Sequence, residues 1–187
     1  MKIFLLSLGT NRAQGRSGRF SFLATRSSQM RSVHFSHSEG MVNIANKPTT
    51  HRVAVAVGTV ELPRRICDAV FDDKISINTK GDIRTVAKIA AVNAAKQTSN
   101  LIPLCHQIPL NQVHVDIERI TPDTVQILAS ADATARTGVE MEALTAVSIA
   151  ALTIYDMTKS ALKGTNDKII IKDIHLRSKF GGATIRN

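Results

Sequence analysis

Four ionisable residues flank one long apolar stretch of the sequence, and their types suit proton transfer and the binding of charged groups. Glu140 and Glu142 precede residues 144–152, which are small and mostly apolar, and Asp156 and Lys159 follow them. A segment that is apolar for about three turns predicts a helix that is buried on most of its circumference. The charges at its two ends are therefore expected where a core meets a cleft.

One small molecule cannot easily contact both ends of such a helix. At 1.5 Å rise per residue, Glu142 and Asp156 lie roughly 21 Å apart if the helix is continuous. Either the glutamates precede the helix on an extended segment, or two chains each contribute one end to a shared site. Asp156 and Lys159 are spaced i, i+3 and share a face, so an ordinary surface ion pair is the alternative to a catalytic pair.

Two lysines lie at the ends of another predicted helix, over residues 80–96. Asp82 is its expected N-cap, and Lys80 lies just before the helix N-terminus, where backbone N–H groups favour an anion. Lys96 lies near the C-terminal end. Each lysine taken alone is more often a solvated surface residue.

A histidine and a cysteine lie in the apolar segment 101–110, which contains two prolines and predicts a rigid extended loop. Burying His106 requires a partner or a purpose, so it either contacts a ligand or is a hydrogen-bonded structural histidine. Cys105 and His106 do not form a nucleophile–base pair, because neighbours in an extended segment point to opposite sides.

The remaining elements must position these groups. Alternation predicts a hairpin with a turn at Thr121-Pro-Asp, and the order strand, helix, helix, strand, strand, helix, strand predicts an α+β fold. Its mainly antiparallel sheet would carry helices on one face. No internal repeat, glycine-rich phosphate loop or metal motif appears. We expect strands over 53–60, 113–120, 124–130 and 168–176, and helices over about 64–73, 80–96 and 138–159.

Composition divides the chain of 187 residues, which has a net charge of +9. Residues 1–40 contain eight serines and six Lys/Arg against one acid, which is typical of a mitochondrial transit peptide; a disordered leader is the alternative. Residues 41–187 are expected to form a single catalytic domain. There 18 basic residues oppose 14 acids, which suits an anionic small molecule and argues against nucleic acid. No apolar run is long enough to span a bilayer, and the two cysteines form no metal or disulfide pattern.

Several motifs occur together in a distinctive order and spacing. Over about residues 36–182, the sequence resembles the cyclic pyranopterin monophosphate synthases, accessory enzymes that act second in molybdenum cofactor biosynthesis. The motifs are Met41-Val-Asn, Lys47-Pro-Thr-Thr-His-Arg, Lys80-Gly-Asp, Leu101-Ile-Pro-Leu-Cys-His106, Thr137-Gly-Val-Glu-Met-Glu-Ala-Leu-Thr-Ala-Val-Ser and Tyr155-Asp-Met-Thr-Lys159.

The resemblance implies a ferredoxin-like α+β subunit in a homo-hexamer, a trimer of dimers with sites at subunit interfaces. It implies a lyase that rearranges a cyclised dihydroguanosine triphosphate into cyclic pyranopterin monophosphate and releases pyrophosphate. The upstream radical enzyme of the pathway would be its functional partner, and we expect no nucleic acid or membrane partner. No cofactor is expected, with Mg²⁺ left open as a counter-ion of the triphosphate. The leader would direct the chain to the mitochondrial matrix.

The resemblance also implies roles for individual residues. We hypothesise that Lys80 and Lys159 move protons, with pKa values lowered by neighbouring cations, and that Asp156 orients Lys159. By position, Asp156 matches the family's active-site aspartate; Leu104, Cys105, His106, Met141 and Glu142 match its substrate-contacting segments; and Lys80, Lys96, Glu140, Lys159 and Lys179 match its functional charged residues.

The sequence departs from the family pattern after Lys179, where Phe180 precedes Gly181-Gly182 and the tail lacks a further basic stretch. Because Lys179 is retained, we expect this loop still to function. Two other classes of function fit the sequence less well. The first is an RNA-binding module, but the predicted strands lack the aromatic residues on which such a module stacks bases. A non-catalytic assembly or carrier subunit would have no need of the retained Asp156, Lys159, Lys80 and His106.

Overall fold

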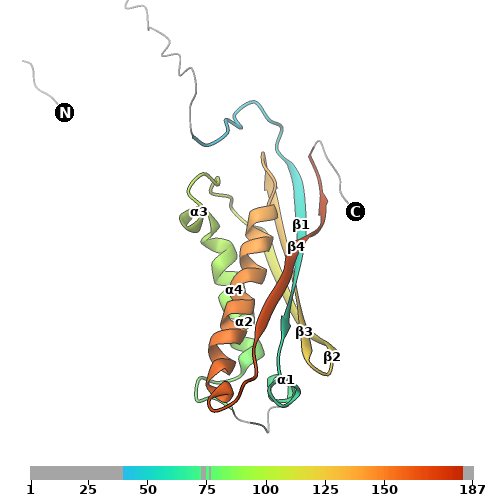
Figure 1. Cartoon of the computed structure of the whole chain (residues 1–187). Helices are drawn as coiled ribbons and strands as arrows, with labels where there is room; N and C mark the ends of the chain where they lie inside the picture. Colours follow the sequence, from blue (N-terminus) through green and yellow to red (C-terminus); the bar gives the residue numbers. More distant parts are fainter. Residues whose placement is uncertain (1–39, 73–74, 76, 183–187) are drawn as a thin grey trace, which may run out of the picture. The chain divides into compact units, whose positions relative to one another are not determined.

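The computed structural model describes residues 40–72, 75 and 77–182, so nearly all of the predicted leader, residues 1–40, lies outside them. The described chain folds into one antiparallel sheet of order β2-β3-β1-β4 with helices on one face (Figure 1). This ferredoxin-like arrangement confirms the predicted α+β fold. The strands are β1 (Thr50–Glu61), β2 (Gln112–Thr121), β3 (Thr124–Ala135) and β4 (Ile170–Phe180); the helices are α1 (Arg64–Phe71), α2 (Ile83–Lys96), α3 (Thr98–Leu101), α4 (Glu140–Thr158) and the 3-10 helix η1 (Lys159–Leu162).

The sheet buries small side chains against the helices. Along β3, every second residue is fully buried, as alternation across a strand requires. Gly58 in β1 allows α4 to approach closely, because a Cβ there would lie 2.7 Å from Cγ1 of Val147 and 2.9 Å from Cγ1 of Ile174. The helix that carries the charged residues is thus held directly against the sheet.

Helix α4 is continuous from Glu140 to Thr158, so both glutamates belong to the helix rather than to an extended segment before it. Its buried side chains include four alanines, Ala143, Ala146, Ala150 and Ala151, while Leu152 remains exposed. After α4 the chain forms η1 and then turns at Gly164, whose φ of 77° is the left-handed conformation that favours glycine. No helix of the described residues is long and apolar enough to cross a membrane.

Helix α2 packs beside α4 and runs antiparallel to it (Figure 1). Asp82 caps α2 as predicted, since its carboxylate accepts a hydrogen bond of 2.7 Å from the Thr85 backbone N–H. Lys80, just before α2, lies at the C-terminal end of α4, where it contacts Asp156. Lys96 therefore lies toward the N-terminal end of α4.

Several bounds differ from those predicted. The single turn α3 was missed, because four residues are too few to show helical periodicity. Strand β3 continues to Ala135 and β4 to Phe180, beyond the expected ends at 130 and 176. Both extensions are paired with β1, and that pairing is not visible in local sequence.

Candidate active site

Apart from Lys96, the predicted site residues form two clusters at opposite ends of α4. In the first cluster, the Asp156 carboxylate accepts a hydrogen bond of 2.6 Å from Lys159 Nζ and a second one from Lys80 Nζ. All three side chains are about half exposed. The hydrogen bonds from Lys159 and Lys80 lower the pKa of Asp156 to about 2. This carboxylate is therefore ionised and shared between two ammonium groups.

The hypothesis that neighbouring cations lower the pKa of Lys159 is wrong for this subunit. The hydrogen bond and negative charge of Asp156 instead raise the pKa of Lys159. Near pH 7, Lys159 is consequently a cation that can hold an anion or donate a proton, and it is not a ready base. The predicted role of Asp156 in orienting Lys159 agrees with the contact.

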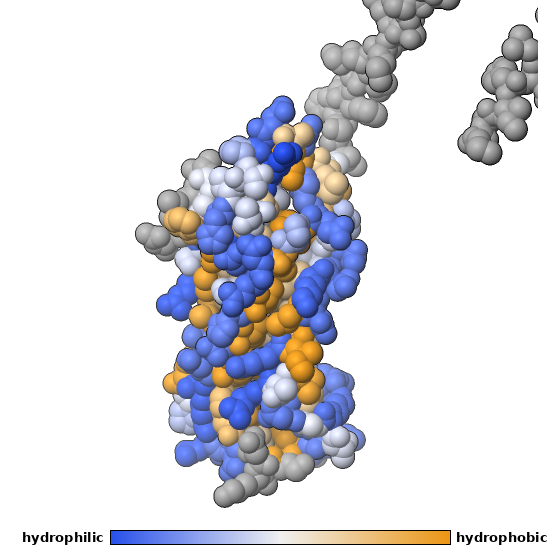
Figure 2. Space-filling model, turned by 180° about the vertical axis from the view of Figure 1, so that it is seen from behind, coloured by the Kyte–Doolittle hydropathy of each residue, from blue (hydrophilic) through white to orange (hydrophobic). Residues whose placement is uncertain are grey.

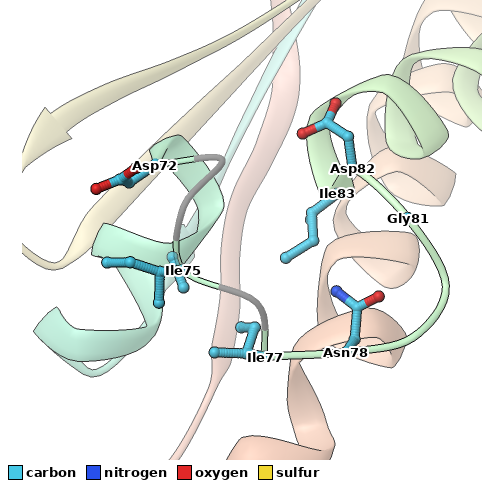
Figure 3. A pocket seen from close by; sticks show the side chains of 8 residues that line it. Asp72, Ile75, Ile77, Asn78, Gly81, Asp82 and Ile83 are labelled. Atoms are coloured by element: carbon cyan, nitrogen blue, oxygen red, sulfur yellow. The ribbon is translucent and has the colours of Figure 1, made fainter.

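A pocket of about 190 Å³ lies between the end of α1 and the start of α2, close to Lys80 in sequence (Figure 3). Ile83 points into it, while the Asp82 carboxylate turns toward the first turn of α2. Its described lining is aliphatic and acidic, and no lysine or arginine belongs to it. This lining does not suit a triphosphate, so we do not assign the pocket to the active site.

The second cluster lies at the N-terminal end of α4. Lys179 Nζ of β4 donates a hydrogen bond of 2.8 Å to Glu140 Oε1, and both side chains are only about a quarter exposed. Desolvation alone would raise the pKa of Glu140, but the hydrogen bond from Lys179 and the charges of Lys179 and Arg52 outweigh it and lower the pKa. Glu140 is thus an ionised carboxylate at a helix N-terminus, where the helix dipole also favours it.

Beside this pair is an open pocket of about 380 Å³. The Glu142 carboxylate is nearly buried, its residue being 4% exposed, and Oε2 has no hydrogen-bond partner among the described residues. Burial, and secondarily the charge of Glu140, raise the pKa of Glu142. The pocket brings together six of the predicted site residues: Leu104, Cys105, His106, Glu140, Met141 and Glu142.

Cys105 is half-buried in this pocket. Desolvation, with a smaller contribution from the charge of Glu142, raises the pKa of its thiol. The thiol is therefore neutral near pH 7 and does not supply a thiolate nucleophile. It can contribute packing against a ligand, as can its neighbour Leu104, which is exposed.

Among the lining residues that were not predicted as site residues, Lys47 carries a charge. Lys47 lies at the pocket that holds Glu140 and Glu142, and it makes no ion pair with a described residue. Its place in the Lys47-Pro-Thr-Thr-His-Arg motif was the only signal in the sequence. Lys96, which was predicted, is exposed at the end of α2 and is not among the residues that line this pocket.

No metal site is evident within residues 40–182 as described, since no three His, Cys, Asp or Glu side chains gather there. The charged groups that could meet an anion are instead lysines: Lys80 and Lys159 at one end of α4, and Lys47 and Lys179 at the other.

The sequence model of the MoaC family matches residues 41–182. The chain belongs to the MoaC family. It is 49% identical over 146 residues to the cyclic pyranopterin monophosphate synthase of Desulforapulum autotrophicum, an alignment that covers 76% of this chain and 83% of that protein. The resemblance noted in the sequence is thereby confirmed, and the chain is an enzyme of this family.

Two eukaryotic relatives align over more of the chain. The mitochondrial cyclic pyranopterin monophosphate synthase of Arabidopsis thaliana is 43% identical over 166 residues, which cover 88% of this chain and 58% of that protein. Molybdenum cofactor biosynthesis protein 1 of Drosophila melanogaster is 40% identical over 167 residues, which cover 89% of this chain and 28% of that protein. These names associate the family with molybdenum cofactor biosynthesis.

Proposed function

We propose that this enzyme is a cyclic pyranopterin monophosphate synthase that rearranges a cyclised dihydroguanosine triphosphate, closes a cyclic phosphate and releases pyrophosphate. The observation that carries the proposal is the double cluster on α4, where cationic groups and carboxylates of the family motifs are held at two ends of one buried helix. Family membership and the names of the relatives support the same reaction.

The chemistry calls for these residue types. A triphosphate carries about four negative charges near neutral pH, and cations aimed at it stabilise both the bound substrate and the departing pyrophosphate. Lys159, held by Asp156, would donate a proton during ring opening or to the leaving group, and Lys80 would act beside it. At the other end, Glu140 and Glu142 would accept hydrogen bonds from the guanine-derived N–H edge, and His106 would donate to a phosphate or sugar oxygen.

A complete site needs two subunits. Because α4 is continuous, Glu142 and Asp156 lie about 21 Å apart within one chain. We therefore propose that one end of α4 meets the other end of a second copy, in the homo-hexamer, a trimer of dimers, that the resemblance implies. Figure 2 shows hydrophobic surface left uncovered along the middle of the face seen from behind. Large exposed side chains available for such a contact include Ile89, Leu152 and Tyr155.

The remaining assignments are proposals from the resemblance and, for the location, from the name of one relative. We propose that the enzyme works in mitochondria, like the Arabidopsis relative whose name says so, and that the upstream radical enzyme supplies its substrate. We propose that no cofactor takes part and that Mg²⁺ serves at most as a counter-ion of the triphosphate. Chelation of Mg²⁺ with EDTA should then alter KM and leave kcat nearly unchanged; loss of kcat would contradict this assignment.

The decisive experiment measures pyrophosphate release from the cyclised dihydroguanosine triphosphate by the full chain and by its Asp156→Ala variant. Release by the full chain together with loss in the variant would support the function and the role of Asp156. If the full chain released no pyrophosphate while binding the triphosphate, the proposal would be reduced to a binding function. Copurified RNA would favour the RNA-binding alternative.

A further inference from the structure

The position of Lys179 depends on a short end segment of an edge strand. Among the strands of the described residues, β4 pairs with β1 alone, and its ladder is interrupted twice by register shifts. Beyond the second shift only three residues, 178–180, remain paired with β1. So short a ladder specifies its register weakly, and other contacts must hold it in place.

Lys179 and Phe180 lie on opposite faces of the sheet. Lys179 pairs with the fully buried Ala54 and reaches the helical layer, where it meets Glu140. Phe180 pairs with Val53 and lies on the face that carries no helices. A slip of one residue would exchange these two faces and remove Lys179 from Glu140.

On that uncovered face, Phe180 meets the ring of His51. Their ring centroids are 6.4 Å apart and the planes are inclined at 61°, which is an edge-to-face contact. Gly181, the next residue, also packs against His51, because a Cβ at this position would lie 2.1 Å from the His51 carbonyl oxygen. The φ of Gly181 is 93°, which also favours glycine. The end of β4 thus packs against His51 in two ways, through the Phe180 ring and through the Gly181 backbone.

The neighbouring strand fixes His51 in turn. His51 Nε2 lies 2.6 Å from Asp132 Oδ2, and Asn111 Nδ2 donates a hydrogen bond of 2.9 Å to the other oxygen of that carboxylate. Asp132 is about a quarter exposed, whereas His51 is about half exposed. The ring that Phe180 contacts is therefore anchored to β3, at the centre of the sheet.

We propose that Phe180 and His51 are positioning residues for Lys179: their contact on the uncovered face locks the register of the end of β4, so that Lys179 holds Glu140, which lines the candidate substrate pocket. This assigns a role to Phe180, the residue at which the sequence leaves the family pattern. The kinetic test rests on the proposed function, whereas the structural test below does not.

The kinetic test compares Phe180→Ala, Phe180→Tyr and His51→Ala in the full chain, with pyrophosphate release as the readout. Loss of either ring should raise KM about three- to tenfold, with a smaller change in kcat, while Phe180→Tyr retains the ring and should behave as wild type. Ile170→Ala is the matched control, because Ile170 is an exposed apolar residue at the other end of the same strand. An unchanged KM in both alanine variants would overturn the proposal.

A double mutant separates positioning from general destabilisation. If Phe180 acts through Lys179, then Phe180→Ala should have no further effect on KM in a Lys179→Ala background. An equal effect in both backgrounds would show that Phe180 acts on the site by another route and would contradict the proposal.

Amide hydrogen exchange tests the contact without any activity. Phe180→Ala and His51→Ala should speed exchange in the segment 178–180 and leave β3 protected, whereas Ile170→Ala should leave this segment unchanged. Unaltered exchange in 178–180 would overturn the proposal even if the enzyme is active. A wild-type chain that releases no pyrophosphate but shows the expected exchange would refute the proposed function alone.

Discussion

Lys159 donates a hydrogen bond of 2.6 Å to the Asp156 carboxylate one helical turn before it, and Lys80 reaches the same carboxylate from the loop before α2. Because the pKa of Asp156 is about 2, below its value in an unfolded chain, these pairs stabilise the fold above about pH 4. That stabilisation is lost as the pH falls through about 2. A loss of activity near pH 5 would therefore not come from protonation of Asp156.

Asp156→Asn keeps the shape of the side chain but removes its charge. We expect pyrophosphate release to fall at least about 100-fold, because Lys159 is no longer oriented. The pKa of Lys159 should fall at the same time, which can be followed by NMR of its side-chain carbon next to Nζ. Asp156→Asn with full activity, or with an unchanged Lys159 pKa, would contradict the assigned role.

A site shared between subunits predicts complementation. Asp156→Ala removes one end of the site and Glu140→Ala the other, so each pure variant should be inactive. Random mixed oligomers should recover up to about a quarter of the wild-type activity, since that share of interfaces pairs two intact ends. Mixing Asp156→Ala with Lys80→Ala, which damage the same end, is the control and should recover nothing. Recovery in neither mixture would indicate that each site lies within one chain.

The raised pKa of Glu142 predicts that this residue makes the stability of the fold depend on pH. Its pKa is raised in the folded chain by burial, so the protonated form contributes stability below the unfolded pKa of about 4.3, and this is lost as the pH rises through the folded value. Glu142→Gln should therefore raise Tm at pH 7.5 by about 2–5 °C and flatten the dependence of Tm on pH. Thermal melts between pH 4 and 8 measure both effects.

Glu140→Gln is the matched control for that experiment, because Glu140 has a lowered pKa and an ion pair with Lys179. It should lower Tm at pH 7.5 instead of raising it. The same sign of change in both variants would show that the two carboxylates do not differ as their environments indicate.

Lys47 is expected to bind the substrate as an unpaired cation at the pocket. Lys47→Ala should raise KM about three- to tenfold with little change in kcat, and the effect should shrink as salt screens the charge. Lys168→Ala, which removes an exposed lysine of the segment before β4, is the control. An equal response of both variants to salt would mean that only net charge matters.

The sequence was sufficient for the order and kind of the main elements, because α4 is a long, nearly continuous apolar stretch and the β2–β3 hairpin has alternating strands. The Asp82 cap was also predictable, since it depends on local chemistry. The ends of β3 and β4 were not, because they depend on pairing with β1, which is distant in the chain.

Spacing alone did not connect the members of the site. Lys80 and Asp156 are 76 positions apart, and Glu140 and Lys179 are 39 positions apart, so only the fold brings each pair together. The resemblance supplied the residues but not their environments. Crowding by other cations was hypothesised to lower the pKa of Lys159, whereas the Asp156 carboxylate beside it raises that pKa.

The continuity of α4 limits which sequence changes the helix can accept. Each residue of a helix turns the next by about 100°, so inserting or deleting one residue between Glu140 and Asp156 would rotate one cluster about the helix axis relative to the other. Substitutions that keep small apolar side chains preserve that angular phase, whereas a change of length does not. Helix α4 should therefore tolerate conservative substitutions between the two clusters but not insertions or deletions.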